Sequence, residues 1–283
     1  MARKRRKHLL IGIIACLCLL VSGWFSFGPG FANNNSREVT IGIVGQSKAE
    51  AAIWHKVDQK AQRDYGIKVK TKVFTDYNQP NKALKNGDID LNAIQTTTFM
   101  HTWSKANHTK IVSLGQTYIA PIRLYSKKYH KLNQLPQGAT IAIPSDAATE
   151  SRALYVLKNA GLIKLRPSHK LKTIADIIQN RQNLKIKEVS DEQCARIIDS
   201  VSAVIVNNDF AIPAGLGPKE TIYTEPINHD SAGAINNICA RADQKDNSDY
   251  AKVVKCYQTA ETKRLYRKYY GDMQQAVWDV KLN

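Results

Sequence analysis

The 283-residue chain lacks the short motifs by which many enzymes are recognised from sequence alone. It has no G-x-S-x-G nucleophile elbow, no phosphate-binding loop and no G-x-G-x-x-G dinucleotide motif. None of its seven histidines stands in H-x-H or H-E-x-x-H spacing, so we expect neither a metal site nor a cofactor. An enzyme is therefore an alternative function and not the main one.

Cysteine is scarce. Outside the N-terminal apolar run only Cys194, Cys239 and Cys256 occur, and no two of them have C-x-x-C spacing. Three is an odd number, which does not fit a framework made only of paired disulfides. We expect buried thiols, with a Cys239–Cys256 disulfide as the alternative.

Acidic residues are too few to balance the basic ones, 24 against 41, and the net charge is +17. The excess does not indicate nucleic acid as a partner. The chain has no RGG tract, zinc-finger spacing or aromatic-basic motif, and its lysines are scattered among Gln, Asn and Asp. An exported protein that faces an anionic envelope accounts for the charge.

The N-terminus indicates export. Basic residues 3–7 precede the uncharged run Leu9–Phe27, which as a helix is about 28 Å long, close to a membrane's hydrocarbon core. Leu20–Gly23 resembles a bacterial lipobox, but Trp24 stands where a lipidated cysteine is required. We predict that 1–37 is a signal sequence or membrane anchor plus linker. The protein is then extracytoplasmic, either membrane-associated or secreted after cleavage.

Short apolar strands alternate with amphipathic helices, which is the pattern of an α/β fold. Strands at 39–44 and 69–74 around a helix at 48–64 predict a parallel, right-handed βαβ unit. We predict further strands at 88–94, 140–143, 184–189, 201–206 and 234–241. We predict further helices at 80–85, 99–105, 147–159, 173–179, 192–199, 245–270 and 272–280.

Two places in this pattern are candidate crossings between lobes. The β-rich segment 110–126 is interrupted by Ala120-Pro121, and the chain crosses back after 221–224. We therefore predict one lobe from 38–120 with 226–283 and a second from 121–225.

The stretch Thr140–Leu157 combines a buried strand, the turn Pro144-Ser145-Asp146 and a helix. The backbone N–H groups at the start of such a helix attract an anion. Arg152, in the second turn, can donate two parallel hydrogen bonds to a carboxylate. The alternative is an ordinary βα junction with a surface arginine.

Polar residues also follow other strands at their carboxyl ends, where ligands bind in open α/β sheets. Tyr77 lies in the loop after 69–74, and the turn from Gln95 to Phe99 follows 88–94. Asn207 and Asp209 follow 201–206. Asp209 either caps the next segment or binds a ligand's ammonium group, and the sequence leaves both open.

Three spaced blocks resemble the NlpA/MetQ lipoprotein family, the methionine-binding, substrate-binding proteins of ABC importers. They are F-T-D-Y-x-x-P-N-x-A-L-x-x-G-D-I-D-x-N-A-x-Q at 74–95, P-S-D-x-x-x-x-x-R-A-L at 144–154 and A-V-I-V-N-N-D-F-A at 203–211. The resemblance implies a two-lobed, periplasmic-binding-protein-like fold of type II with two crossover segments. It also implies an amino-acid ligand in the cleft, and an ABC permease and ATPase as partners.

The resemblance also suggests roles for residues. Arg152 looks like the family's carboxylate-binding arginine, and Asn207 and Asn236 look like its polar contacts to the ligand's amino-acid end. Tyr77 and Phe99 resemble its aromatic walls. The predicted ligand-binding residues are Arg152, Asn207, Asn236, Tyr77, Gln95, Thr96 and Phe99.

The chain departs from the family pattern near the ligand's side chain. Thr96 stands where members usually have histidine, and Ile94 stands where an aromatic or apolar residue is usual. Gly233-Ala234 replaces a common aromatic. We therefore expect methionine or a related amino acid or short peptide as ligand. A ligand-free or regulatory membrane-tethered protein on the same fold is the alternative, besides an enzyme.

Overall fold

The structure, a computed structural model, describes residues 37–45, 47–168 and 171–280. The predicted signal sequence or anchor, 1–37, lies outside the described residues except for Arg37. Within the described part of the chain, no helix is both long and apolar enough to cross a membrane.

The first sheet has the strand order β13-β4-β12-β3-β1-β2. Strands β1, β2 and β3 are parallel, whereas β12 runs antiparallel to β3 and β4, and β13 runs antiparallel to β4. The parallel pairing of β1 with β2 confirms the predicted βαβ unit. The strands are β1 (Arg37–Val44), β2 (Ile67–Phe74), β3 (Leu91–Thr96), β4 (Ile111–Ile119), β12 (Ile235–Arg241) and β13 (Gln275–Ala276).

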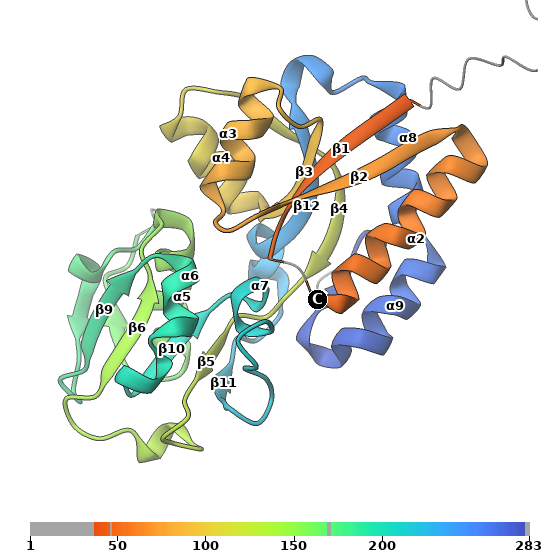
Figure 1. Ribbon diagram of the computed structural model, residues 1–283. Coiled ribbons are helices and arrows are strands. Elements are labelled where there is room, and N and C mark those ends of the chain that lie inside the picture. Colours follow the sequence, from red (N-terminus) through yellow and green to blue (C-terminus); the bar gives the residue numbers. More distant parts are fainter. Residues whose placement is uncertain (1–36, 46, 169–170, 281–283) are drawn as a thin grey trace, which may run out of the picture. The chain divides into compact units, whose positions relative to one another are not determined.

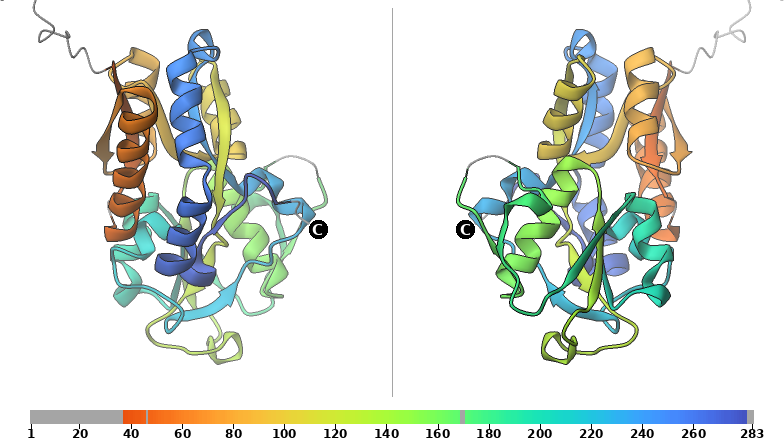
Figure 2. Two further views of the ribbon diagram at one scale, coloured as in Figure 1. Left: turned by 90° about the vertical axis from the view of Figure 1, so that its right-hand side faces the viewer. Right: turned by 90° about the vertical axis from the view of Figure 1, so that its left-hand side faces the viewer.

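Helices cover both faces of this sheet (Figure 1). One face carries α2 (Lys48–Tyr65), α8 (Ser248–Tyr257) and α9 (Ala260–Tyr270), and α2 packs against both of the later helices although they are far away in the sequence (Figure 2). The other face carries α3 (Asn78–Asn86) and α4 (Thr97–Ala106). A sheet covered on both faces explains why β1 is apolar almost throughout its second half.

Helix α2 shows how local sequence fixes an element. The hydroxyl group of Ser47 accepts a hydrogen bond from the Glu50 amide at 3.0 Å and caps the first turn. Ile53, Trp54, Val57 and Ala61 form the buried stripe. Gly66 ends the helix at φ 64°, a left-handed conformation that glycine adopts at low cost.

The second sheet has the strand order β11-β5-β10-β6-β9. Its strands are β5 (Arg123–Tyr125), β6 (Thr140–Pro144), β9 (Lys185–Val189), β10 (Ala203–Val206) and β11 (Thr221–Thr224). Helix α5 (Ala147–Asn159) packs on one face, and α6 (Asp191–Arg196) with α7 (Asn208–Ala211) packs on the other. The small hairpin β7 (Lys164–Leu165) and β8 (Ile177–Gln179) is separate.

Two segments connect the sheets. One runs from the end of β4 at Ile119 to the start of β5 at Arg123, and the other from the end of β11 at Thr224 to β12 at Ile235. Two sheets joined by two crossovers confirm the predicted fold class. The residue limits of the lobes, 38–120 with 226–283 and 121–225, stay a prediction.

The prediction of a helix at 173–179 is wrong. Ile174–Asp176 forms a single 3₁₀ turn, closed by a hydrogen bond of 3.1 Å from the Thr173 amide to the Asp176 carboxylate. Ile177–Gln179 is then extended and pairs with β7. Two consecutive β-branched isoleucines favour this extended conformation over a helix.

We predicted one helix at 245–270 and another at 272–280, and both predictions are wrong. The first segment contains two helices, and the second contains a short strand. The long helix breaks after α8, because the hydroxyl group of Thr259 accepts from the Thr262 amide and caps a new helix, α9. At 272–280 the short strand β13 pairs with β4 and forms the edge of the sheet instead of a helix. Edge pairing here depends on tertiary contacts that local periodicity does not contain.

The three described cysteines are free and buried, which agrees with the expected thiols and leaves no Cys239–Cys256 disulfide. Cys239 packs among the residues beneath α3 and α4, and its sulfur lies 3.6 Å from that of Met100. Cys256 belongs to the core on the α2 side of the sheet.

Candidate functional site

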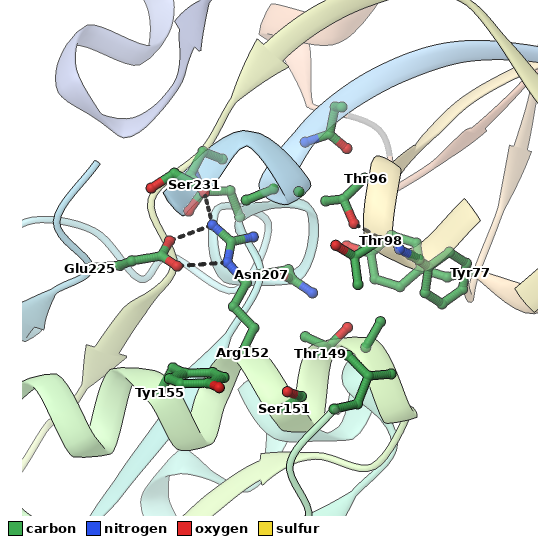
Figure 3. A pocket seen from close by; sticks show the side chains of 18 of the residues that line it. Tyr77, Thr96, Thr98, Thr149, Ser151, Arg152, Tyr155, Asn207, Glu225 and Ser231 are labelled. Atoms are coloured by element: carbon green, nitrogen blue, oxygen red, sulfur yellow. Dashed lines mark hydrogen bonds and ion pairs between the residues drawn. The ribbon is translucent and has the colours of Figure 1, made fainter. Parts of the chain in front are cut away.

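A cavity of about 690 Å³ is lined by residues of both sheets and of their connections. Six of the seven predicted ligand-binding residues line it, and Figure 3 shows several of them around the open space. The six are Tyr77, Thr96, Phe99, Arg152, Asn207 and Asn236. Its size is within the range of about 300–1,000 Å³ that is usual for small-molecule sites.

One face of α5 forms part of the wall. Ala148, Arg152, Tyr155 and Asn159 all line the cavity, at intervals of three and four residues. The intervening Leu154 and Leu157 are fully buried in the lobe core. The helix therefore holds Arg152 at the cavity from a rigid support.

Arg152 already has a carboxylate partner. Its Nε donates to Glu225 Oε1 at 2.9 Å, and its Nη2 donates both to Glu225 Oε2 and to the carbonyl oxygen of Ala120, the latter at 2.8 Å. The two side chains are 16% and 14% exposed (Figure 3). Arg152 Nη1 takes no part in these bonds, so this amino group is the one left for a ligand carboxylate.

The start of α5 is not the open anion site that the sequence suggested. Asp146 caps the helix, and its Oδ1 accepts from the Ala148 and Thr149 amides at 3.1 Å each. A carboxylate in this position satisfies the helix terminus itself. A ligand anion at the cavity therefore depends on Arg152 more than on the helix end.

Asn207 and Asn236 line the cavity from different sheets. Asn207 follows β10, and its Nδ2 donates to Asp191 Oδ1 at 3.1 Å. Asn236 lies on β12 directly opposite Thr96 of β3. Among the described residues the side-chain amide of Asn236 has no hydrogen-bond partner, whereas the next residue, Asn237, binds Thr97 and Ser113.

Aromatic rings form another part of the wall. The ring of Tyr77 meets that of Phe99 edge to face at 6.0 Å between centroids, and that of Phe210 at 5.1 Å. Tyr77 and Phe99, with Ile94 and Ala148, make an apolar surface of the cavity, and Phe210 supports Tyr77 without lining it. Such a surface suits an aliphatic or thioether side chain.

Asp209 introduces a negative charge beside these rings. Its Oδ2 accepts from the Tyr77 hydroxyl group at 2.9 Å, and the residue lines the cavity. Burial raises the pKa of Asp209 to about 6, although the bond from Tyr77 lowers it. Its carboxylate makes no capping bond to the α7 backbone, so of the two roles that the sequence left open, a ligand contact fits better.

Gln95 does not reach the cavity. It is 1% exposed and belongs to a closed ring of three amides with Asn81 and Asn92. Each amide nitrogen donates to the next oxygen, at 2.6 to 2.9 Å. Successive side chains of a strand point to opposite faces, so Gln95 and Thr96 cannot share one wall.

The sequence reasoning missed Glu225, which lines the cavity and binds Arg152. A partner 73 positions away leaves no local signal. The cavity therefore presents the Arg152 guanidinium group, the carboxylates of Asp209 and Glu225, several side-chain amides and an apolar wall. No cluster of His, Cys, Asp and Glu in the described part of the chain is suited to hold a metal ion.

These features define a two-lobed binding protein for a small zwitterionic molecule. The sequence profile described as NlpA lipoprotein matches residues 39–278, and the chain belongs to this family.

Relatives and solved structures extend the likeness. A probable D-methionine-binding lipoprotein MetQ from Pasteurella multocida is 38% identical over 228 residues, covering 80% of this chain and 81% of that protein. The substrate-binding protein of a methionine transporter from Streptococcus pneumoniae has a TM-score of 0.81 at 39% identity, covering 85% of this chain and 96% of that one. A nutrient-binding protein from Burkholderia cenocepacia, solved bound to methionine, has a TM-score of 0.80 at 36% identity, covering 84% and 99%.

Proposed function

We propose that this protein is the extracytoplasmic substrate-binding protein of an ABC amino-acid importer. It binds methionine or a related amino acid or short peptide in the cavity and delivers it to a permease driven by an ATPase. The observation that carries the proposal is the cavity itself, where Arg152, Asn207, Asp209 and Asn236 surround a space beside an apolar wall. Relatives named for methionine binding support the same ligand class.

The ligand's groups have complementary partners. Arg152 Nη1 donates to the ligand carboxylate, because charge-assisted bonds are the strong ones in a desolvated site. Asp209 and the Asn207 carbonyl group receive the ammonium group. The side chain lies against Tyr77, Phe99 and Ile94.

A ligand-free regulatory protein on the same fold is a second candidate, and one observation favours it. Glu225 already neutralises Arg152, so the guanidinium group does not require a ligand in order to be paired. A screen of amino acids and dipeptides by thermal unfolding separates the two. The full chain in mild detergent gains about 2.7 kcal/mol from a ligand at 100 times its Kd, and a scaffold gains nothing.

We further propose that the protein acts outside the cytoplasm at the membrane, as expected for a member of a lipoprotein family. Whether the segment 1–37 anchors it without lipid is tested by labelling cells with a radioactive fatty acid. Unlabelled protein in the membrane fraction supports an anchor, whereas labelled protein contradicts it. Trp24→Cys is the matched variant, because it supplies the cysteine that the lipobox-like Leu20–Gly23 lacks.

A further inference from the structure

A pair of acidic side chains supports Asn207 from behind the cavity wall. Asp191, at the start of α6, is 8% exposed and accepts from Asn207 Nδ2 at 3.1 Å. The carboxyl group of Asp191 also interacts electrostatically with that of Asp146, the cap of α5. The pair thus joins the helix that carries Arg152 to a residue at the start of α7.

The pair needs a proton. Asp146 Oδ1 accepts two backbone N–H groups, but Oδ2 is buried and has no donor among the described residues as long as both acids are ionised. Two carboxylates in contact repel each other, whereas one proton between them makes a hydrogen bond. A single retained proton therefore satisfies Asp146 Oδ2 and removes the repulsion.

The surroundings place this proton on Asp191. Asp146 Oδ1 is already taken up by the two backbone N–H groups at the N-terminus of α5. Burial raises the pKa of Asp191 well above its usual value, and the charge of Asp146 raises it further, while the bond from Asn207 lowers it. Glu192 of α6 also acts on Asp191, and Asp191 in turn acts on Cys194 of the same helix and on Tyr77, which precedes α3.

We infer that Asp191 is a positioning residue for ligand binding: protonated against Asp146, it accepts from Asn207 Nδ2 and so leaves Asn207 Oδ1 as an acceptor for the ligand's ammonium group. An amide free to rotate offers a ligand either its oxygen or its nitrogen. An amide held in this way offers only the oxygen. The inference rests on the proposed function, because it assigns one ligand contact within the same cavity.

Asp191→Asn tests the proton directly, since an asparagine can donate to Asp146 and accept from Asn207 as the protonated acid does. We expect Asp191→Asn to bind methionine within about twofold of the wild type. Asp191→Ala releases Asn207 and should weaken binding about tenfold or more. Asp199→Asn, an exposed acid in the turn after α6, is the matched control and should have little effect.

The ligand provides a second readout. The loss in Asp191→Ala should be large for methionine and at most about threefold for 4-(methylthio)butanoate, which lacks the α-amino group. Asp191→Asn binding as weakly as Asp191→Ala would overturn the inference, because it would mean that the negative charge of Asp191 is what matters. Equal losses of affinity for both ligands in Asp191→Ala would overturn the inference as well, since Asn207 would then not contact the ammonium group.

Unfolding by urea separates this inference from the proposed function. If the wild type binds no amino acid or dipeptide, the proposed function fails, and the retained proton is still measurable. The folded state then holds a proton that unfolded Asp191 has lost, so stability falls as pH rises above the usual carboxyl range. Asp191→Asn should lose less unfolding free energy than the wild type over that rise in pH. Identical slopes of unfolding free energy against pH would refute the shared proton.

Discussion

The hydroxyl group of Tyr77 donates a hydrogen bond of 2.9 Å to Asp209, 132 positions later in the chain. Tyr77 precedes α3 of the first sheet, and Asp209 lies in α7 beside the second. The bond therefore crosses the cavity region between residues of the two sheets. The bond also makes the pKa of Asp209 depend on Tyr77.

Ligand affinity should depend on pH through Asp209. Its pKa is raised to about 6, so acidification through that value protonates the carboxylate and removes the partner of the ligand's ammonium group. We expect affinity to fall about tenfold or more below pH 6. Calorimetric titration between pH 5 and about 8 measures this, and Asp209→Asn should show weak binding without that fall.

Tyr77→Phe is the matched variant for this pH effect. The bond from Tyr77 lowers the pKa of Asp209, so its removal should move the midpoint of the affinity loss to higher pH. An unchanged midpoint would show that another group titrates. The aromatic wall survives the substitution, because only the hydroxyl group is lost.

Arg152→Ala should weaken ligand binding by about 2–5 kcal/mol, which is roughly 30- to 5,000-fold in Kd. Arg152→Lys should recover only part, because an ammonium group cannot reproduce the planar geometry. Arg152→Ala also leaves the carboxylate of Glu225, whose side chain is 14% exposed, without its cationic partner. We therefore expect Arg152→Ala to lose about 3 kcal/mol of unfolding free energy as well.

The double variant Arg152→Ala with Glu225→Gln separates these two effects. Neutralising Glu225 should restore much of the stability and none of the affinity. Urea unfolding and calorimetry on the same samples give both values. Near-wild-type affinity in Arg152→Ala would mean that the ligand carboxylate binds elsewhere.

Gln95→Ala should destabilise the fold without affecting the site. It leaves Asn81 Nδ2 and Asn92 Oδ1 unpaired where both residues are 0% exposed, at about 1–3 kcal/mol for each group. Ligand affinity should stay within about threefold, because Gln95 does not line the cavity. Gln59→Ala, on the exposed face of α2, is the control and should change stability by less than about 0.5 kcal/mol. A large affinity loss in Gln95→Ala would restore Gln95 as a ligand contact.

Ligand binding should compact the protein. The cavity is lined from both sheets, and only two segments connect them, so closure about those segments excludes water from the ligand. Small-angle scattering with and without methionine measures the radius of gyration. An unchanged radius at saturating ligand would contradict closure.

Much of the fold follows from local patterns, and α5 shows why. Its predicted bounds of 147–159 agree with the structure, because Asp146 is a strong cap and the buried residues recur at helical spacing. The prediction of a helix at 173–179 was wrong because a 3₁₀ turn followed by two isoleucines has the same apolar spacing as a short helix. Over so few residues, apolar periodicity does not distinguish a helix from a strand, and the pairing of β8 with β7 determines the extended conformation.

The candidate site was predictable only in part, for a different reason. The pattern of strands and helices indicated Arg152 and Asn207, and the family resemblance added Asn236. All three line the cavity. Strand alternation alone argues against Gln95 beside Thr96, so this error was avoidable. The pairing of Arg152 with Glu225 was not predictable, because their separation of 73 positions closes only in the folded chain.

Glu225 also links the two connecting segments to each other. Its amide donates to the Ile122 carbonyl group at 3.0 Å, and its side chain accepts from the Ile122 amide at 3.1 Å, while Arg152 binds Ala120 in the same segment. The guanidinium group that we propose as the ligand's partner is thus bonded to both connecting segments. Occupancy of the cavity should therefore be readable at a distance from it, as slower hydrogen–deuterium exchange of the Ile122 and Glu225 amides.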